Sequence, residues 1–279
     1  MGGVSLQDLP PLREALDAAG ILAAKRFGQH FLLDLNICRK IVRIADVSDG
    51  QQVLEVGPGP GGLTRALLEA GAEVTAVETD ARFLPLLATL AEAAPGRLKV
   101  IHADALTIEE TAQVGAGAAV VANLPYNVGS PLLVKWLTGS FRPASLTLMF
   151  QAEVARRIAA RPGDEDYGRL AVIAQAVCEA RIAMNLPARA FTPPPKVDSA
   201  VVRLTPRPER PADPILEALQ KVTAAAFGQR RKMLRSSVKA LGGAALCEQA
   251  GIDPDARAET VDVAGFLRMA DRVAADSSR

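Results

Sequence analysis

Apolar segments of strand length alternate with segments of helical periodicity through most of this chain. The strand-like segments lie at residues 52–56, 73–77, 98–101, 118–122, 145–150, 170–177 and 197–204. The helix-like segments lie at residues 63–70, 83–93, from 131 onward and 153–160. This alternation is typical of helices packed on a doubly wound, mostly parallel sheet, and it predicts an α/β fold.

The segments near the two ends of this pattern carry further local signals. Asp34 precedes Ile37, Ile41 and Ile44, which recur at helical spacing, so Asp34 is placed to cap that helix. The last two strand-like segments have no full helix between them, which predicts an antiparallel hairpin at the sheet edge. Several prolines follow the last strand-like segment and indicate a linker. We therefore predict a catalytic domain at residues 1–208 and a small all-helical C-terminal domain at residues 209–279.

Composition excludes several classes of protein. The 279 residues are 49% hydrophobic, which is enough for one sizeable core and a smaller second domain. Three dispersed cysteines and two histidines indicate neither a disulfide framework nor a metal centre. The sequence contains neither a secretory signal pattern nor an uninterrupted apolar span. We therefore expect a cytoplasmic protein that binds no metal.

Charge is unevenly distributed along the chain. Residues 203–240 carry nine Lys or Arg against three Asp or Glu, although the formal net charge of the whole chain is +1. A basic block suits an anionic polymer, and a solvated helix face is the alternative interpretation.

A glycine-rich loop follows the first strand-like segment. Gly57-Pro58-Gly59-Pro60-Gly61-Gly62 matches GxGxxG, and Glu78 lies 21 residues after Gly57, as in dinucleotide-binding sites. However, the two prolines lack the N–H groups that would cradle a pyrophosphate, and Glu55 adds a negative charge beside the loop. The loop therefore favours a cofactor with a ribose, a cationic end and no phosphate. S-adenosylmethionine has these properties.

Two later strand ends carry polar groups that suit a nucleoside. Asp104 follows the third segment, where it can accept a hydrogen bond from the adenine amine of the cofactor. Asn123-Leu124-Pro125-Tyr126 follows the fourth and offers an amide oxygen for an exocyclic amine beside a ring for stacking. Alone, this tetrapeptide is equally compatible with a turn that buries a tyrosine. Its place after Gly57, Glu78 and Asp104, each at a strand end, favours a binding site.

Together these motifs resemble the ribosomal RNA adenine dimethyltransferases, and most closely the bacterial small-subunit branch. The matching segments are residues 28–32, 55–64, 123–127, 153–155, 167–170, 191–201 and 226–234. The resemblance implies a Rossmann-like, seven-stranded class I methyltransferase fold that uses S-adenosylmethionine. It also implies dimethylation of the N6 amine of two adjacent adenosines in small-subunit (16S) ribosomal RNA, linked to small-subunit biogenesis.

The resemblance assigns site residues position by position. The implied cofactor-binding residues are His30, Leu32, Gly57, Gly59, Glu78, Asp104 and Asn123. The implied catalytic residues are Asn123, Leu124, Pro125, Tyr126 and Phe191. Tyr126 and Phe191 would stack on the two faces of the target base. His30 stands where the family often has Asn, and either side chain offers a donor or an acceptor.

The resemblance also implies that an RNA binds the basic residues of this chain. We expect contacts with ribosomal RNA phosphates from Lys25, Arg26, Arg230, Arg231, Lys232 and Arg235. The expected partner is the small ribosomal subunit with its RNA. We expect a monomer and no membrane association.

Other functions remain open at this point. An adenine methyltransferase acting on large-subunit RNA or on DNA would carry the same tetrapeptide. A non-catalytic ribosome assembly factor could use this fold as an RNA-binding platform. A NAD-linked oxidoreductase fits the glycine spacing but not the prolines and Glu55.

Overall fold

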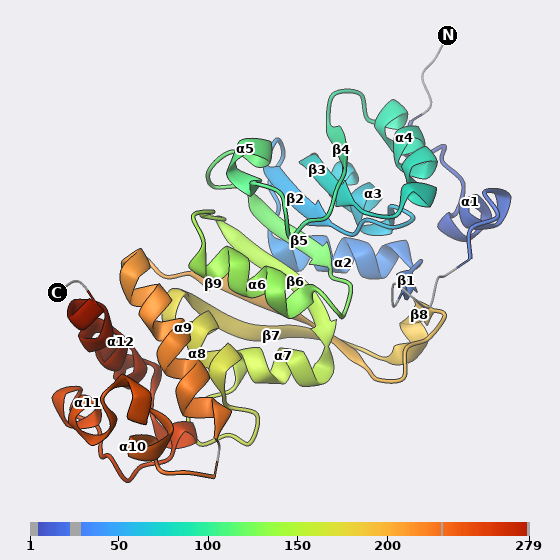
Figure 1. The fold of residues 1–279 in the computed structure, drawn as a ribbon. Helices are drawn as coiled ribbons and strands as arrows, with labels where there is room; N and C mark the ends of the chain where they lie inside the picture. The colour runs from blue at the N-terminus through green and yellow to red at the C-terminus, as the bar shows by residue number, and fades with distance from the viewer. Residues whose placement is uncertain (1–4, 23–28, 230, 278–279) are drawn as a thin grey trace. The chain divides into compact units, whose positions relative to one another are not determined.

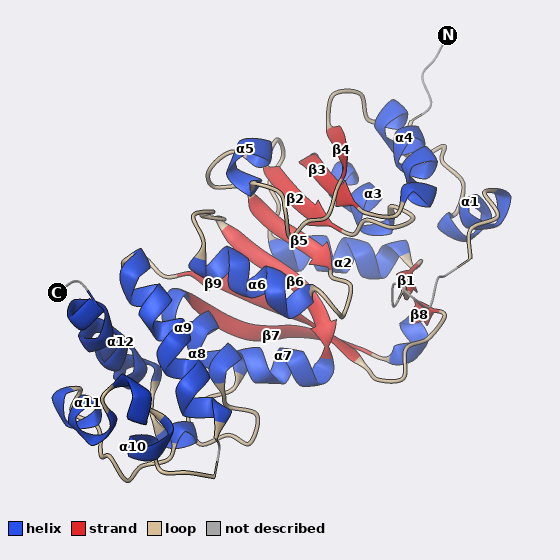
Figure 2. Cartoon of the chain, in the orientation of Figure 1, coloured by secondary structure: helices blue, strands red, loops and turns tan. Residues whose placement is uncertain are grey.

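The chain folds around a seven-stranded sheet. A computed structural model describes residues 5–22, 29–229 and 231–277 (Figure 1). The strands of the sheet lie in the order β4-β3-β2-β5-β6-β9-β7 (Figure 2). Their bounds are Gln52–Val56 (β2), Glu73–Glu78 (β3), Leu98–His102 (β4), Ala119–Asn123 (β5), Ser145–Gln151 (β6), Cys178–Leu186 (β7) and Ser199–Pro206 (β9). Strands β4, β3, β2, β5 and β6 pair in parallel, so the predicted mostly parallel α/β fold is confirmed.

Helices precede, connect and follow these strands. In the first half of the chain they are Leu12–Ala18 (α1), Leu35–Ala45 (α2), Gly62–Glu69 (α3), Leu84–Ala93 (α4), Glu110–Val114 (α5) and Gly129–Thr138 (α6). The remaining ones are Ala152–Ala159 (α7), Arg169–Val177 (α8), Asp213–Gly228 (α9), Leu234–Ser237 (α10), Gly243–Gln249 (α11) and Val263–Ser277 (α12). Among the described residues, none of the helices has both the length and the apolar character needed to cross a membrane.

The central strands are apolar because both of their faces are covered. Val53, Leu54 and Val56 of β2 are all buried, as are Val120 and Val121 of β5. Continuous burial of this kind is typical of parallel strands that lie between two helical layers. It explains why strand β5 reads as an apolar run that ends in one polar residue.

Helix α2 begins as the sequence predicts. The Asp34 carboxylate accepts hydrogen bonds from the backbone N–H groups of Asn36, at 2.8 Å, and Ile37, at 3.4 Å. These donors have no partner within the helix, and the aspartate supplies one. The helix buries Ile41 in the core and leads to strand β2, whose carboxyl end forms part of the pocket described below.

One predicted strand is wrong. Residues 170–177 form helix α8, and the strand follows at Cys178–Leu186 (β7). Helix α8 is buried on nearly all sides, from Ala171 to Val177. An apolar run of this length has no periodicity to separate a buried helix from a buried strand. Strands β7 and β9 are neighbours at one edge of the sheet, so the predicted hairpin named the wrong residues for its first strand. Its antiparallel orientation stays a prediction.

The chain divides into two compact units, each of several segments. The first comprises residues 1–133, 141–155 and 182–203, and the second comprises residues 134–140, 156–181 and 204–279. The second unit thus contains the predicted helical segment after residue 208 and adds helix α8, which contacts α9 and α12 within the same unit. A single boundary along the sequence cannot describe this division, because the chain passes between the units several times.

An aromatic cluster lies inside the second unit. Tyr167 is fully buried, and its hydroxyl donates a hydrogen bond of 3.0 Å to the carbonyl oxygen of Val261. Its ring meets that of Phe227 edge to face, and Phe227 in turn packs on Phe266. Tyr167, from the conspicuous Tyr167-Gly168-Arg169-Leu170 segment, therefore has a structural role in this unit.

Removal of the α2 cap should destabilise the protein measurably. Asp34→Ala is expected to lower the free energy of unfolding by about 1 kcal/mol, because two backbone N–H groups lose their acceptor. Urea denaturation of the full chain measures this. Lys40→Ala, at an exposed position of the same helix, is the control and should change stability by less than about 0.5 kcal/mol. Equal effects of the two substitutions would contradict the capping role.

Candidate active site

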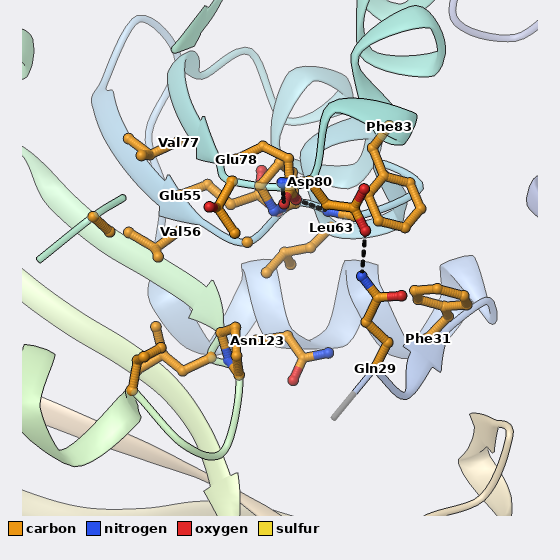
Figure 3. A pocket seen from close by; sticks show the side chains of 18 of the residues that line it. Gln29, Phe31, Glu55, Val56, Leu63, Val77, Glu78, Asp80, Phe83 and Asn123 are labelled. Atoms are coloured by element: carbon orange, nitrogen blue, oxygen red, sulfur yellow. Dashed lines mark hydrogen bonds between the residues drawn. The ribbon is translucent and has the colours of Figure 1, made fainter. Parts of the chain in front are cut away.

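A pocket of about 310 Å³ lies where four parallel strands end (Figure 3). Its walls come from the segments that follow β2, β3, β4 and β5, together with residues 29–32. The carboxyl ends of parallel strands meet at one edge of a sheet, which is where open α/β folds bind their ligands. The four polar strand ends identified in the sequence therefore reach one cavity.

The glycine loop lies close to the Asn123-Leu124-Pro125-Tyr126 turn. Gly57 has a φ of 70°, and its N–H donates to the Val77 carbonyl oxygen at 2.9 Å. A Cβ atom at Gly57 would lie 3.3 Å from Cδ of Pro125. Both the left-handed backbone and this close approach favour glycine at the position. The loop and the turn thus share one corner of the pocket.

Glu78 ends strand β3 inside the pocket. It is 5% exposed, and its two carboxylate oxygens accept backbone N–H groups, Oε2 from Gly59 at 3.0 Å and Oε1 from Asp80 at 2.8 Å. Burial raises the pKa of this carboxyl, and the two backbone hydrogen bonds oppose the rise. Each oxygen keeps a further lone pair, so the group can also accept from the hydroxyls of a ribose.

Glu55 is a second buried acid in the pocket wall. It is 1% exposed, and among the described residues its Oε2 atom has no hydrogen-bond partner. Burial raises its pKa to about 8. Near pH 7 this carboxyl is therefore mostly protonated. A positively charged ligand group beside it would favour its ionised form, whereas a pyrophosphate would disfavour ionisation.

Asp104 lies on the loop after β4. Its Oδ1 atom accepts the Leu106 N–H at 2.9 Å, which fixes the side chain at the turn. The carboxylate is exposed and lines the pocket, with Oδ2 making no hydrogen bond to the described residues. This oxygen is placed to accept a hydrogen bond from a ligand.

Asn123 and Tyr126 lie at the end of β5, and Asp104 lies after β4, so the strands β3 and β2 separate them in the sheet. Asn123 is the last residue of β5, half-buried, and its side-chain amide makes no hydrogen bond to the described residues. The Tyr126 hydroxyl lies 2.9 Å from the Ser199 hydroxyl oxygen, in hydrogen-bonding distance. Burial raises the pKa of Tyr126, so the hydroxyl stays protonated at neutral pH. An available amide and an anchored ring therefore share one corner.

His30 lies beside Tyr126. Their ring centroids are 5.8 Å apart with the planes inclined by 30°, and His30 Nδ1 lies 2.7 Å from the carbonyl oxygen of Pro193. The next residues along the chain form the short strand Phe31–Leu32 (β1), which pairs antiparallel with Phe191–Thr192 (β8). The predicted residues His30 and Leu32 thus both line the pocket.

Phe191 is placed differently from the expectation. It is 3% exposed, belongs to the hydrophobic core, and is not among the residues that line the pocket. Its β-bridge to Leu32 explains this, because the pairing of β8 with β1 turns the ring into the core. The pocket therefore contains the ring of Tyr126 but not that of Phe191. The stacking role of Phe191 stays a prediction.

The basic residues predicted to bind RNA are only partly described. Lys25, Arg26 and Arg230 lie outside the described residues. Arg231 and Lys232 are exposed, and Arg235 makes a 2.8 Å ion pair with Asp255. All three belong to the second unit.

Several pocket residues were not identified in the sequence. Gln29 and Asp80 line the pocket and hydrogen-bond to each other, and Phe31 and Phe83 form an edge-to-face pair beside them (Figure 3). A signal for Asp80 was present, since it follows the predicted ribose acceptor Glu78 by two residues. Nothing local marked Gln29 as its partner, because 51 residues separate the two.

Known proteins resemble this chain over nearly its whole length. The family model described as Ribosomal RNA adenine dimethylase matches residues 21–275. A Phenylobacterium zucineum protein named "Ribosomal RNA small subunit methyltransferase A" is 68% identical over 96% of this chain and 94% of its own length. A protein of the same name from Caulobacter vibrioides is 67% identical over 89% of this chain and 96% of its own length.

Two solved structures share the fold. A dimethyladenosine transferase from Plasmodium falciparum superposes with a TM-score of 0.71 at 25% identity, covering 86% of this chain and 96% of that one. The 23S rRNA methyltransferase ErmE gives a TM-score of 0.67 at 28% identity, covering 87% of this chain and 99% of that one.

The buried acid Glu55 should make stability depend on pH. The pKa of a glutamate in an unfolded chain is about 4.3, whereas burial raises the pKa of Glu55 in the folded protein to about 8. Between these values the folded state binds the extra proton, so stability from this group falls as the pH rises from about 4.5 to about 8. Glu55→Gln removes this titration. Urea denaturation of both proteins should show the variant gaining relative stability as the pH rises; parallel pH profiles would contradict the shift.

Proposed function

This chain belongs to the ribosomal RNA adenine dimethylase family, and from that premise we propose its substrate and the roles of its residues. It is an S-adenosylmethionine-dependent enzyme that dimethylates adenine in ribosomal RNA. We propose that its targets are the N6 amines of two adjacent adenosines in small-subunit RNA. The available Asn123 amide beside the anchored Tyr126 ring, in the pocket that also contains Glu78, supports an adenine amine as the target. The choice of the small subunit is supported by the relatives at 67–68% identity that are named for it.

The pocket residues fit S-adenosylmethionine. The prolines of the glycine loop disfavour a diphosphate, and the Glu55 oxygen that has no hydrogen-bond partner among the described residues favours a cationic ligand. When bound, this cofactor supplies an electrophilic methyl group. In our proposal Glu78 accepts hydrogen bonds from the ribose hydroxyls, and Asp104 accepts one from the cofactor's adenine amine. His30, Leu32, Gly57 and Gly59 complete the site.

Alignment of the target amine is the main catalytic task. The lone pair of an adenine amine is delocalised into the ring, so the nucleophile is weak while the methyl donor is already reactive. We propose that the Asn123 amide oxygen and the Leu124 carbonyl oxygen accept the two amine hydrogens and direct the lone pair. These oxygens also stabilise the positive charge that develops on the nitrogen. Pro125 sets the turn, Tyr126 stacks on the base, and no general base is required.

Most of the proposed RNA contacts belong to the second unit. Arg231 and Lys232 are exposed and close in sequence to Arg235, so they present positive charge to a phosphate backbone. The proposed partner is the small ribosomal subunit. Lys25, Arg26 and Arg230 keep the same proposed role.

The competing substrates differ in the support they have. ErmE, whose title names 23S rRNA, shares the fold at 28% identity, whereas the two relatives at 67–68% identity are named for the small subunit. A non-catalytic assembly factor would not need the Glu78, Asp104 and Asn123 positions that meet in one pocket. These considerations favour a catalyst acting on the small subunit.

The deciding experiment supplies the protein with labelled S-adenosylmethionine and, in parallel reactions, with large ribosomal subunits or with small ribosomal subunits that lack the modification. Nucleosides are then identified by mass spectrometry. We expect N6-dimethyladenosine at two adjacent positions. Label on large-subunit RNA alone, or none on either subunit, would overturn the proposal.

Loss of the Asn123 amide should reduce turnover more than cofactor binding. Asn123→Ala is expected to lower kcat by roughly 100-fold, because the developing charge loses a pre-placed acceptor. Single-turnover methylation of small subunits measures this. Asn36→Ala, whose amide contacts Arg39 away from the pocket, is the control and should keep normal turnover. Near-normal kcat in Asn123→Ala would exclude the alignment role.

Charge reversal in the second unit should weaken RNA binding. Arg231→Glu combined with Lys232→Glu is expected to lower the affinity for small subunits and to reduce the slope of log K against log salt by about 1 to 2. A matched reversal, Lys40→Glu with Arg43→Glu on exposed positions of α2, controls for net charge. If both double variants lose the same affinity, only overall charge matters and the assignment to the second unit fails.

A further inference from the structure

Gln29, Asp80 and Arg82 form a closed ring of hydrogen bonds beside the pocket, and Figure 3 shows the bond between Gln29 and Asp80. Gln29 Nε2 donates to Asp80 Oδ2 at 2.8 Å, and Arg82 Nη2 donates to Gln29 Oε1 at 3.1 Å. Arg82 Nη2 also donates to Asp80 Oδ2 at 2.6 Å, and its Nε donates to Oδ1 at 2.9 Å. Each of the three side chains therefore contacts both of the others.

The ring joins two walls of the pocket that are distant in sequence. On one side the Asp80 N–H donates to Oε1 of Glu78, the proposed ribose acceptor. On the other side Gln29 directly precedes His30, which lies against Tyr126. Phe31 packs edge to face on Phe83, at 5.6 Å between ring centroids, and closes the same wall. The position of residues 29–31 is thus tied to the end of β3.

The charge balance of the ring suits a permanent structural contact. Asp80 is 5% exposed, so an unpaired carboxylate there would be costly, and Arg82 supplies the opposite charge. The Arg82 guanidinium lowers the pKa of Asp80 to about 2. The ion pair therefore persists at every pH at which the protein is expected to work.

The ring is already satisfied without a ligand. The Gln29 amide uses its nitrogen on Asp80 and its oxygen on Arg82, and the Asp80 oxygens are both engaged. Side chains occupied in this way are suited to hold the chain rather than to contact a cofactor. A pocket that is held in shape before binding loses less conformational entropy when the ligand enters.

We propose that Gln29, Asp80 and Arg82 are positioning residues that hold residues 29–32 against the end of β3 and so form the cofactor pocket before the cofactor binds. This inference rests on the proposed cofactor site. It adds a role for three residues that are not proposed to touch the reacting atoms. The ring acts on cofactor affinity.

Gln29→Leu tests the ring while it preserves side-chain size. We expect the KM for S-adenosylmethionine and the Kd for S-adenosylhomocysteine to rise about tenfold, which corresponds to about 1.4 kcal/mol. The kcat at saturating cofactor should stay within about twofold. In the cofactor-free full chain, the backbone amides of residues 30–32 should exchange hydrogen faster than in the wild type.

Two further variants separate a positioning role from a general loss of stability. Arg39→Leu removes a comparable set of contacts, to Glu69 and Asn36, outside the pocket, and should leave KM, Kd and exchange at residues 30–32 unchanged. Arg82→Met should resemble Gln29→Leu. Because the three side chains form one unit, the double variant should lose less affinity than the sum of the two single losses. If Gln29→Leu does not fold, Arg82→Met alone carries the comparison.

The outcomes distinguish this inference from the proposed function. Wild-type KM, Kd and exchange in both Gln29→Leu and Arg82→Met would overturn the positioning role while leaving the methyltransferase assignment intact. Full additivity of the two losses would also overturn it. Failure of the wild type to bind S-adenosylhomocysteine would instead overturn the proposed cofactor site, and the exchange measurement would still report on the ring.

Discussion

Parallel pairing of β2 with β3 on one side and β5 on the other is the constraint on which the site depends. The backbone ladder fixes Val56 opposite Val77 and Leu54 opposite Val120, so the strands end at the same edge of the sheet. A shift of one residue would turn Glu78 to the other face of the sheet. The glycine loop, the acid and the amide therefore meet because of backbone hydrogen bonds rather than through any attraction to one another.

The strand pairing places the acidic side chains in the pocket, and their surroundings determine which kind of ligand the pocket favours. Asp80 is neutralised by Arg82, whereas Glu55 is buried with one oxygen unpartnered among the described residues. The two acids consequently differ in pKa, at about 2 for Asp80 and about 8 for Glu55. A structural carboxylate and an acid suited to a cationic ligand can thus lie in one pocket, because their surroundings differ.

Much of the fold and site was predictable because the useful signals were local. Asp34 caps the helix that begins at the next residue, and Glu78 and Asn123 are the polar last residues of their strands. Helix α8 was mistaken for a strand because it is buried on nearly every side and its sequence has no polar face. Phe191 belongs to a family motif, but its pairing partner in β1 directs its ring into the core.

The sequence by itself determined the family, the order of polar strand ends and the chemical class of the cofactor, since each depends on neighbouring residues. Only the tertiary structure decided which side chains hold the pocket in shape. Gln29 meets Asp80 across 51 residues, and Tyr126 meets Ser199 across 73. No local pattern encodes such contacts, because they arise only when the sheet brings distant segments of the chain together.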